Sequence, residues 1–371
     1  MRILYLTRSD SVHDQRFLQT LAQSDHEGFA WRLNAGQSPT PEGVTSLDWS
    51  GVEGGLQAWN LPFAQKELEK AIRAVKPDLI HAGPLQDLAF LAAKTGFPNL
   101  LAMSWGFDLM KDVWADKLSE HRARFALQRS KCLITDALCS AEKAVELGFA
   151  REKICIFPWG VDLQHFSPEN TKSSGAAWRE SMGWQDKLVL LCLRSWEPNY
   201  GVDVLLSAFE KATAQNPDLR LILLSDGSLH DRYMEMLENE NFKDKVFVGG
   251  RVPNEDLIRY LGAADVYVTP SHVDGSSVSL MEALACGLPT IASDIPANLE
   301  WVYHSENGWI FPDNDVETLT ETILAIPGHP LEEMAQRARA TAERKADWRI
   351  NRQILLNCYQ QLLPIEGKNN E

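Results

Sequence analysis

Short apolar runs alternate with helix-forming segments along almost the whole chain. In the first half these runs include residues 2–8 (RILYLTR), 77–83 (PDLIHAG) and 131–137 (KCLITDA). A second series begins near residue 187 and includes KLVLLCLRS (187–195) and DVYVTPS (265–271). Such alternation is typical of βα units, whose crossover connections build parallel sheets. The pattern therefore predicts an α/β fold with doubly wound, Rossmann-like sheets.

The chain is long enough for more than one such sheet. Its 371 residues favour two or three domains, and the polar stretch SPENTKSSGAA at 167–177 separates the two series of runs. We expect an N-terminal domain over 1–166, a C-terminal domain over 178–345 and a final amphipathic helix over 346–364. Because ligands of doubly wound sheets bind beyond the carboxyl ends of the strands, we expect the site in a cleft between the domains.

Charge and composition exclude several classes of protein. The net charge of −15 argues against nucleic acid as a partner. Most of the negative charge lies after residue 160, which leaves the first half better able to approach an anionic surface. We expect no transmembrane helix and no secretory leader, because apolar runs are short and the first residues are soon followed by charges. The six cysteines show no metal-ligand spacing, so we interpret them as reduced core thiols of a cytoplasmic protein.

The segment 265–294 carries the strongest functional signal. An apolar strand is followed by the loop SHVDGSS and by a helix whose apolar residues recur at three- and four-residue spacing. Gly275, Ser276 and Ser277 open this helix, so free backbone N–H groups and the positive end of the helix dipole face the strand ends. This arrangement suits a phosphate group.

Two carboxylates, Asp274 and Glu282, flank the helix start. Eight residues of helix correspond to roughly 12 Å of rise, which is about the span of a diphosphate with a sugar at each end. Carboxylates accept hydrogen bonds from sugar hydroxyls. The alternative is that Asp274 caps the helix and Glu282 lies on its surface. The apolar neighbours of Glu282 weigh against a surface position, because a buried charge needs a partner.

The pattern PSHVDGSSVSLMEALACGLPTIASD (270–294) resembles the signature of the retaining GT-B glycosyltransferases of family four, in which two glutamates stand eight residues apart. The resemblance continues in LCLRSWEPNYGVDVLLSAF (191–209), ENGWIFPDND (306–315) and IFPWGVDLQHFSP (156–168). It is dense over residues 150–330 and diffuse over 1–130. It implies a GT-B fold in which the second domain binds a nucleotide-diphosphate sugar and the first supplies most of the acceptor site. It also implies that the last helix packs back on the first domain.

The resemblance assigns roles to three side chains. Glu282 matches the glutamate that binds the ribose hydroxyls, and Asp274 matches the one that contacts the donor sugar, with Asp in place of the family's Glu. The amides of Gly275, Ser276, Ser277 and Val278 then lie near the distal phosphate. Arg194 matches the diphosphate-binding arginine, whose charge stabilises the leaving group. The alternative for Arg194 is a surface arginine at a strand end.

One family residue is missing. The family has a lysine five residues after the arginine, whereas RSWEPNYG (194–201) is one residue longer and has no lysine. The sequence leaves open what replaces this lysine. Tyr200 or Asn199 could donate a hydrogen bond to the phosphate, or Arg251 could reach into the site. Asp226 matches a loop near the nucleotide, and Arg251 and Val252 match the turn whose backbone reads the base.

The first domain departs further from the family. Its first loop lacks the glycines found there, and His13, Asp14 and Arg16 open the first helix; we interpret them as facing the acceptor or a phosphate, or as an ordinary capped helix start. Trp105, in SWGFD, replaces a histidine that faces the sugar. His81 follows a buried strand and is interpreted as an acceptor-side residue, with a buried core histidine as the alternative.

Three further features of the sequence bear on function. Residues 313–315 (DND) look like the D-x-D motif of metal-dependent transferases, but Asp315 precedes a helix pattern and is interpreted as an N-cap. We therefore expect no metal and no cofactor. No G-x-G-x-x-G follows either first strand, which argues against an oxidoreductase. Basic residues within 116–131 (DKLSEHRARFALQRSK) indicate either a solvated helix face or docking to an anionic lipid surface.

These observations predict a retaining, metal-independent hexosyltransferase of the cytoplasm. It would move a sugar from a UDP- or GDP-sugar to a hydroxyl group of a glycan or a lipid, with peripheral contact at the inner face of the membrane as the lipid-docking alternative. The other readings are a sugar-nucleotide epimerase and a catalytically impaired protein that binds a nucleotide sugar. The missing lysine and Asp274 leave the impaired protein open.

Overall fold

The structure is a computed structural model, and it describes residues 1–8, 12–34, 39–47, 49, 51–52 and 55–362. The chain divides into two compact units. Unit 1 comprises Met1–Pro158 with Ile350–Glu371, and unit 2 comprises Trp159–Arg349. Within the described ranges, no helix combines the length and the apolar character needed to cross a bilayer.

The boundary between the units differs from the expected one. The stretch 167–177, expected to be an irregular linker, belongs to helix α7 (Pro168–Met182) of unit 2. Its polar residues begin a helix because the Ser167 hydroxyl accepts a hydrogen bond from the Asn170 amide and Pro168 occupies the first turn. Gly175 then lets α7 approach α10 (Asn254–Ala263) closely, since a Cβ there would lie 2.0 Å from the carbonyl carbon of Gly262.

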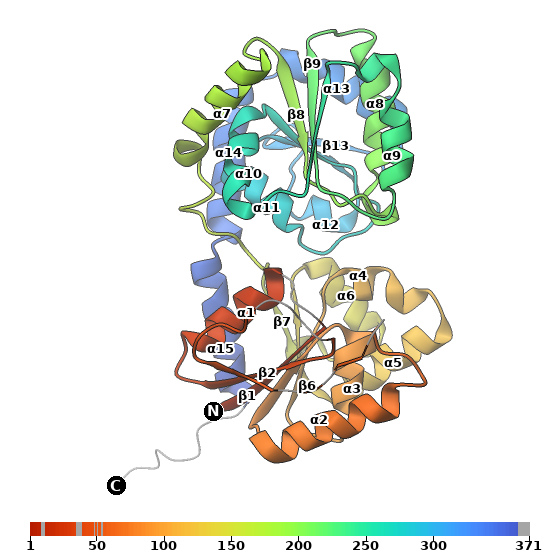
Figure 1. Cartoon of the computed structure of the whole chain (residues 1–371), viewed down its shortest axis with the longest axis vertical. Coiled ribbons are helices and arrows are strands. Elements are labelled where there is room, and N and C mark those ends of the chain that lie inside the picture. The colour runs from red at the N-terminus through yellow and green to blue at the C-terminus, as the bar shows by residue number, and fades with distance from the viewer. Residues whose placement is uncertain (9–11, 35–38, 48, 50, 53–54, 363–371) are drawn as a thin grey trace. The chain divides into compact units, whose positions relative to one another are not determined.

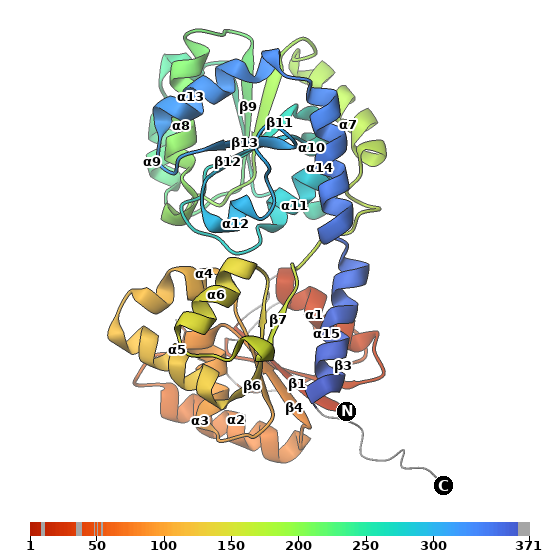
Figure 2. The same cartoon turned by 180° about the vertical axis from the view of Figure 1, so that it is seen from behind.

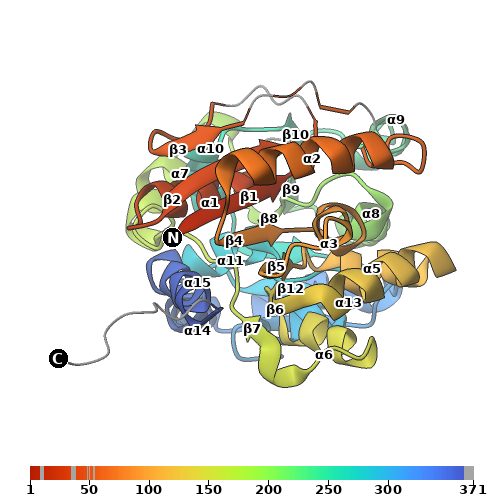
Figure 3. The same ribbon diagram turned by 90° about the horizontal axis from the view of Figure 1, so that it is seen from below.

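Unit 1 is built on a parallel seven-stranded sheet in the order β3-β2-β1-β4-β5-β6-β7 (Figure 3). The strands are β1 (Arg2–Thr7), β2 (Glu27–Arg32), β3 (Val44–Ser46), β4 (Leu79–Ala82), β5 (Leu100–Met103), β6 (Ser130–Thr135) and β7 (Ile154–Ile156). Alternate residues of β1 face opposite sides, so Leu4 and Leu6 join the main core whereas Tyr5 packs on Phe17. The order of the strands reverses at β1, as in a doubly wound fold.

The helices of unit 1 cover both faces of this sheet (Figure 1). They are α1 (Val12–Ala22), α2 (Leu61–Val75), α3 (Phe90–Lys94), α4 (Phe107–Met110), α5 (Lys117–Arg129), α6 (Leu138–Glu146) and α15 (Trp348–Leu362). Helices α2, α3, α5 and α6 contribute buried side chains to the same core as Leu4 and Leu6. Helices α1 and α15 lie on the Tyr5 face.

Unit 2 is built on a parallel six-stranded sheet in the order β10-β9-β8-β11-β12-β13. The strands are β8 (Leu188–Cys192), β9 (Leu219–Leu224), β10 (Val246–Gly250), β11 (Val266–Thr269), β12 (Thr290–Ser293) and β13 (Gly308–Phe311). All of its neighbouring strands run parallel. The order reverses at β8, so β8 and β11 flank the switch point where such sheets bind ligands.

Two separate cores cover the faces of the second sheet. Val189 and Leu191 face a core shared with α7, α10, α11 (Val278–Ala285) and α14 (Leu331–Lys345). Leu190 and Cys192 face a core shared with α8 (Val202–Thr213), α9 (His230–Leu237) and α13 (Val316–Ala325). Figure 2 shows these helix groups on opposite sides of the sheet. A short helix, α12 (Pro296–Leu299), follows β12.

Helix α15 holds the end of the described chain against unit 1. Arg352 donates to the side chain of Gln23, and Cys358 forms a disulfide with Cys155 of β7. The prediction of six reduced thiols is therefore wrong for this pair. Spacing along the sequence could not reveal it, because the two cysteines lie 203 residues apart and meet only through the fold.

His81 lies in the contact between the sheet of unit 1 and helix α15 and is not an acceptor-side residue. Its side chain is fully buried on β4, its Nδ1 lies 2.8 Å from the Tyr359 hydroxyl, and its ring packs edge-on against Tyr5. Burial lowers the pKa of His81 to about 3. The side chain is thus a neutral core histidine that joins β4 to α15.

The buried His81 predicts an acid-sensitive unit 1. In the unfolded chain its pKa returns to about 6.5, so below that pH the unfolded state takes up a proton that the folded state excludes down to about pH 3. Stability is therefore full above pH 6.5 and falls on acidification, by about 2–3 kcal/mol at pH 4.5. Urea titrations of wild type and His81→Gln at pH 7.5, 5.5 and 4.5 should show that the variant loses this part of the slope. His121→Gln, at an exposed position, should keep it; equal slopes in all three proteins would refute the assignment.

Candidate functional site

Arg194 and the loop 270–277 meet at the switch point of unit 2. Arg194 follows β8 by two residues, and the loop follows β11 directly. The two strands are hydrogen-bonded neighbours, with Val266 opposite Leu190. Parallel strands end at the same edge, so the structure brings together two segments that lie about eighty residues apart.

The guanidinium of Arg194 is buried and held on several sides. Its Nη2 donates to Asp274 Oδ2 at 2.6 Å, and its Nη1 donates to the hydroxyls of Ser277 at 2.5 Å and Ser279 at 3.2 Å. The Tyr200 ring stacks on it, with the Arg194 Cζ 4.1 Å from the ring centroid. Only 7% of Arg194 is exposed, which excludes an ordinary surface arginine.

The ion pair keeps Arg194 charged despite its burial. Burial alone would lower the pKa of Arg194, but the Asp274 carboxylate raises it, and the net direction is upward. For Asp274, burial raises the pKa, and Arg194 and the Gly275 amide offset this only in part, so the net direction is also upward. We conclude that this pair places a fixed cation at the sheet edge.

Ser277 begins helix α11. Its hydroxyl accepts a hydrogen bond from the Leu280 amide at 3.3 Å while it also accepts one from Arg194. One side chain thus both caps the helix and binds the cation. Asp274 does not cap α11, because its Oδ1 accepts from the Gly275 amide and its Oδ2 from Arg194.

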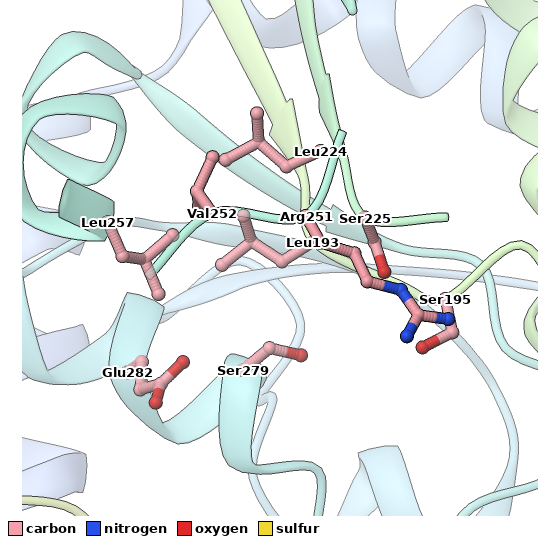
Figure 4. Close-up of a pocket in the computed structure, with 9 residues that line it drawn as sticks. All are labelled: Leu193, Ser195, Leu224, Ser225, Arg251, Val252, Leu257, Ser279 and Glu282. Carbon is pink, nitrogen blue, oxygen red and sulfur yellow. The ribbon is translucent and has the colours of Figure 1, made fainter. Parts of the chain in front are cut away.

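Glu282 lines a pocket of about 420 Å³ beside this ion pair (Figure 4). It is 7% exposed, so the surface alternative is wrong. Apolar and polar side chains share the wall, which comprises Leu193, Ser195, Leu224, Ser225, Arg251, Val252, Leu257, Ser279 and Glu282. Ser279 joins the pocket to the ion pair, because its hydroxyl also accepts from Arg194. Arg251 and Val252, expected from the sequence, are therefore in this pocket.

Other predicted residues of unit 2 lie around the pocket. Asn199 and Tyr200 form a short 3-10 turn (Pro198–Tyr200), and the Asn199 carbonyl accepts from the His272 amide at 2.8 Å. Asn199 thus positions the loop after β11, and Tyr200 positions Arg194. Asp226 is half-exposed and accepts from the Gly227 amide and from His230, which lowers its pKa. Asp226 is not among the residues of the pocket wall.

Sequence reasoning missed three serines of the wall: Ser195, Ser225 and Ser279. Ser279 carried a signal, since it lies three residues before Glu282 and so shares its helix face. Ser195 directly follows Arg194. Ser225 has a φ of 81°, an unusual backbone conformation for a residue other than glycine, which no sequence pattern indicated.

Unit 1 places its predicted residues differently. Asp14 is 5% exposed and accepts a hydrogen bond from the Tyr5 hydroxyl at 2.8 Å, so this oxygen is engaged within unit 1, and a ligand contact of Asp14 stays a prediction. Arg16 lies partly buried on α1, and the side chain of His13 falls outside the described residues. Trp105 is partly buried, and its amide donates to Asp108.

Asp108 is the residue that the SWGFD interpretation overlooked. It is 1% exposed and accepts from the Ser104 hydroxyl and from the amides of Trp105, Leu109 and Leu85. Burial raises its pKa, partly offset by these donors. Asp108 therefore fixes the loop that presents Trp105.

The DND segment has the structural role expected of it. Asp315 caps α13 by accepting from the amide and hydroxyl of Thr318, which confirms the N-cap. Among the described residues there is no group of three or more His, Cys, Asp or Glu side chains able to hold a metal ion.

The basic cluster of α5 is partly occupied by internal contacts. Arg124 pairs with Glu120 and donates to the Leu147 carbonyl, and Arg129 stacks on Phe125 at 3.6 Å. These contacts favour a structural role for both arginines. Docking of this helix to a lipid surface stays a prediction.

Fold and site together define a class: two doubly wound α/β units, with a buried cation and a pocket at the switch point of the second. The chain belongs to the group 1 glycosyltransferases of GT-B fold. The family described as "Glycosyl transferases group 1" matches residues 176–345, and the one described as "Glycosyl transferase 4-like" matches residues 2–137. These matches confirm the family and the fold class predicted from the sequence.

Two curated relatives and one solved structure illustrate the likeness. The chain is 29% identical over 199 residues to a GDP-mannose-dependent monoacylated alpha-(1-6)-phosphatidylinositol monomannoside mannosyltransferase of Corynebacterium glutamicum, covering 52% of this chain and 51% of the relative. It is 27% identical over 224 residues to the putative colanic acid biosynthesis glycosyltransferase WcaL of Escherichia coli, covering 58% and 52%. The chain thus spans about half the length of these relatives. Both are named as transferases, which does not favour the epimerase alternative.

The solved structure is that of Anabaena Alr3699/HepE in complex with UDP. It superposes with a TM-score of 0.80 over 97% of this chain and 100% of that one, at 17% sequence identity. The likeness establishes the fold.

The Arg194–Asp274 pair predicts strong energetic coupling. Arg194→Gln leaves the Asp274 carboxylate without its counter-charge and should lower the free energy of unfolding of unit 2 by about 3 kcal/mol. Asp274→Asn in the same chain should recover part of this loss. A double-mutant cycle by urea unfolding should thus give a coupling energy above about 1 kcal/mol. The exposed pair Glu333–Arg337 on α14 is the control and should couple far more weakly. Additive effects at Arg194 and Asp274 would contradict the account.

Proposed function

We propose that this chain is a retaining, metal-independent glycosyltransferase that moves a sugar from a nucleoside-diphosphate sugar to a hydroxyl group of a glycan or lipid acceptor. The observation that carries the proposal is the buried Arg194 guanidinium, held by Asp274 and Ser277 at the switch point, beside a pocket lined by Glu282. A fixed cation next to a pocket with a carboxylate matches a ligand with an anionic group and a pair of hydroxyls.

Arg194 stabilises the departing diphosphate. When the bond between the anomeric carbon and the phosphate oxygen breaks, negative charge grows on that oxygen. A buried guanidinium stabilises this charge strongly, because no water must reorganise around it. It supplies the positive charge that a metal ion supplies in other transferases. The start of α11 adds oriented N–H groups next to Ser277.

Glu282 binds the ribose hydroxyls in the pocket, and the turn at Arg251 and Val252 contacts the base. The apolar Leu193, Leu224 and Leu257 suit the faces of a planar base. A nucleoside diphosphate is also the ligand class of the similar proteins, one of which is named as GDP-mannose-dependent and another of which was solved with UDP. The base of this chain's donor is uracil or guanine.

Asp274 holds the donor sugar while it keeps Arg194 in place. Each of its carboxylate oxygens accepts one hydrogen bond in the structure and has a further lone pair for a sugar hydroxyl. The acceptor hydroxyl attacks from the face that the diphosphate leaves, and its proton passes to the leaving phosphate. Configuration at the anomeric carbon is then retained without a covalent intermediate on a side chain.

Glu282→Gln tests this function. A panel of UDP- and GDP-sugars is first screened by thermal stabilisation of the wild-type chain, and transfer from the best donor is then assayed with EDTA present throughout. Glu282→Gln should lower kcat/KM by about 10- to 100-fold, the value of one charge-assisted contact to hydroxyl groups. The anomeric proton of the product, measured by NMR, should show the configuration of the donor.

The matched control is Glu332→Gln, the same change at an exposed position on α14. It should leave both stability and transfer unchanged. Wild-type activity in Glu282→Gln, or release of free sugar as the main product in the presence of acceptors, would contradict the proposal.

A further inference from the structure

The ion pair at the switch point has too little positive charge to balance an anionic donor. The charge of Arg194 is already balanced by Asp274, and its Nη1 is already used by Ser277 and Ser279. A sugar-linked diphosphate carries a negative charge on each phosphate. Its binding in a partly buried pocket therefore requires a second cation.

Arg251 is the only cationic side chain among the described residues of the pocket wall, and Glu282 is the only anionic one. It stands in the turn between β10 and α10. The turn is fixed to the neighbouring strand end, because the Gly250 carbonyl accepts from the Ser225 amide at 2.6 Å. Figure 4 shows the Arg251 side chain extending from this turn toward the side of the pocket where Ser195 follows Arg194.

The guanidinium of Arg251 is available for a ligand. The residue is exposed, and its side chain has no ion pair or hydrogen bond to any other residue that the structure describes. Two carboxylates, Glu197 and Asp226, lie within reach of its charge. Hydrogen bonds lower their pKa values, from Ser228 for Glu197 and mainly from the Gly227 amide for Asp226, and the charge of Arg251 lowers both slightly further. Both carboxylates are bound by those neighbours instead.

The other two candidates for the second phosphate contact are engaged elsewhere. The Tyr200 ring stacks on Arg194, and Asn199 holds the loop after β11 through its carbonyl. Neither carries a charge. Arg251 alone combines a cation, a place in the pocket wall and a side chain without a partner among the described residues.

We propose that Arg251 is the second phosphate-binding cation of the donor site, which rests on the proposed function. Its guanidinium binds the diphosphate from the β10–α10 turn, while Arg194 binds it from the end of β8. The negative charge of the bound diphosphate thus offsets the repulsion between the two arginine side chains. The side chain of Arg251 thus binds the phosphates, whereas the backbone of the same turn contacts the base.

Binding of UDP and uridine, and of GDP and guanosine, to the full chain tests the proposal. Calorimetry on wild type first shows which of UDP and GDP binds more tightly. That diphosphate should bind much more tightly than the nucleoside with the same base. Arg251→Ala should lower the affinity for the diphosphate by about 10- to 100-fold and leave the affinity for the nucleoside within about threefold of wild type. Arg251→Lys should restore part of the affinity. Because a phosphate contact is lost, Arg251→Ala should also show a weaker salt dependence of diphosphate binding.

Arg337→Ala, the same charge change at an exposed position on α14, should leave all four affinities unchanged. The melting temperature of ligand-free Arg251→Ala should match that of wild type, which separates a lost contact from a lost fold. If Arg251→Ala lowered the affinities for diphosphate and nucleoside equally, the side chain would act on the nucleoside and the proposal would be overturned. An unchanged affinity for the diphosphate would overturn it as well. If wild type itself binds neither diphosphate, the proposed function fails first.

Discussion

A buried ion pair organises the second unit of this protein. Arg194 and Asp274 come from loops that follow neighbouring strands, and the parallel sheet brings those loops to one edge. Taking both charges out of water is costly, and the cost is offset only because Ser277, Ser279, Tyr200 and the Gly275 amide complete their surroundings. The pair therefore holds the loop after β11, the start of α11 and the end of β8 in one arrangement.

In the proposed function, that arrangement lets donor binding and chemistry share one place. Ser279 joins the ion pair to the pocket, and Glu282 lies one helical turn further along α11, so the cation and the pocket carboxylate are held by the same helix. The pair itself has little net charge. An anionic ligand consequently depends on a further cation, and the pocket wall provides it in Arg251.

The sequence predicted the unit 2 site better than the unit 1 residues, for a physical reason. Arg194 and Asp274 follow the ends of neighbouring strands, and Glu282 lies on the helix that begins just after Asp274, so chain order and the parallel sheet are enough to bring them to one edge. The surroundings of Asp14 and His81 depend instead on Tyr5 and on Tyr359, which lies 278 residues from His81, and no local pattern reveals such partners. The Cys155–Cys358 bond was missed because packing between distant segments decides it. The helix at 168–182 did carry a local signal, the Ser167 cap followed by Pro168, but the polar composition of 167–177 indicated a junction instead.

Amide hydrogen exchange, measured with and without UDP or GDP, reports on the surroundings of the Arg194–Asp274 pair in the full chain. If the Arg194–Asp274 pair and the start of α11 hold the diphosphate, saturating nucleotide should slow exchange in residues 193–200 and 274–282 more than in the parts of unit 2 that lie away from the pocket. Peptides of α13, on the far face of the sheet, should change little. Nucleotide binding that leaves both segments unprotected would contradict the account.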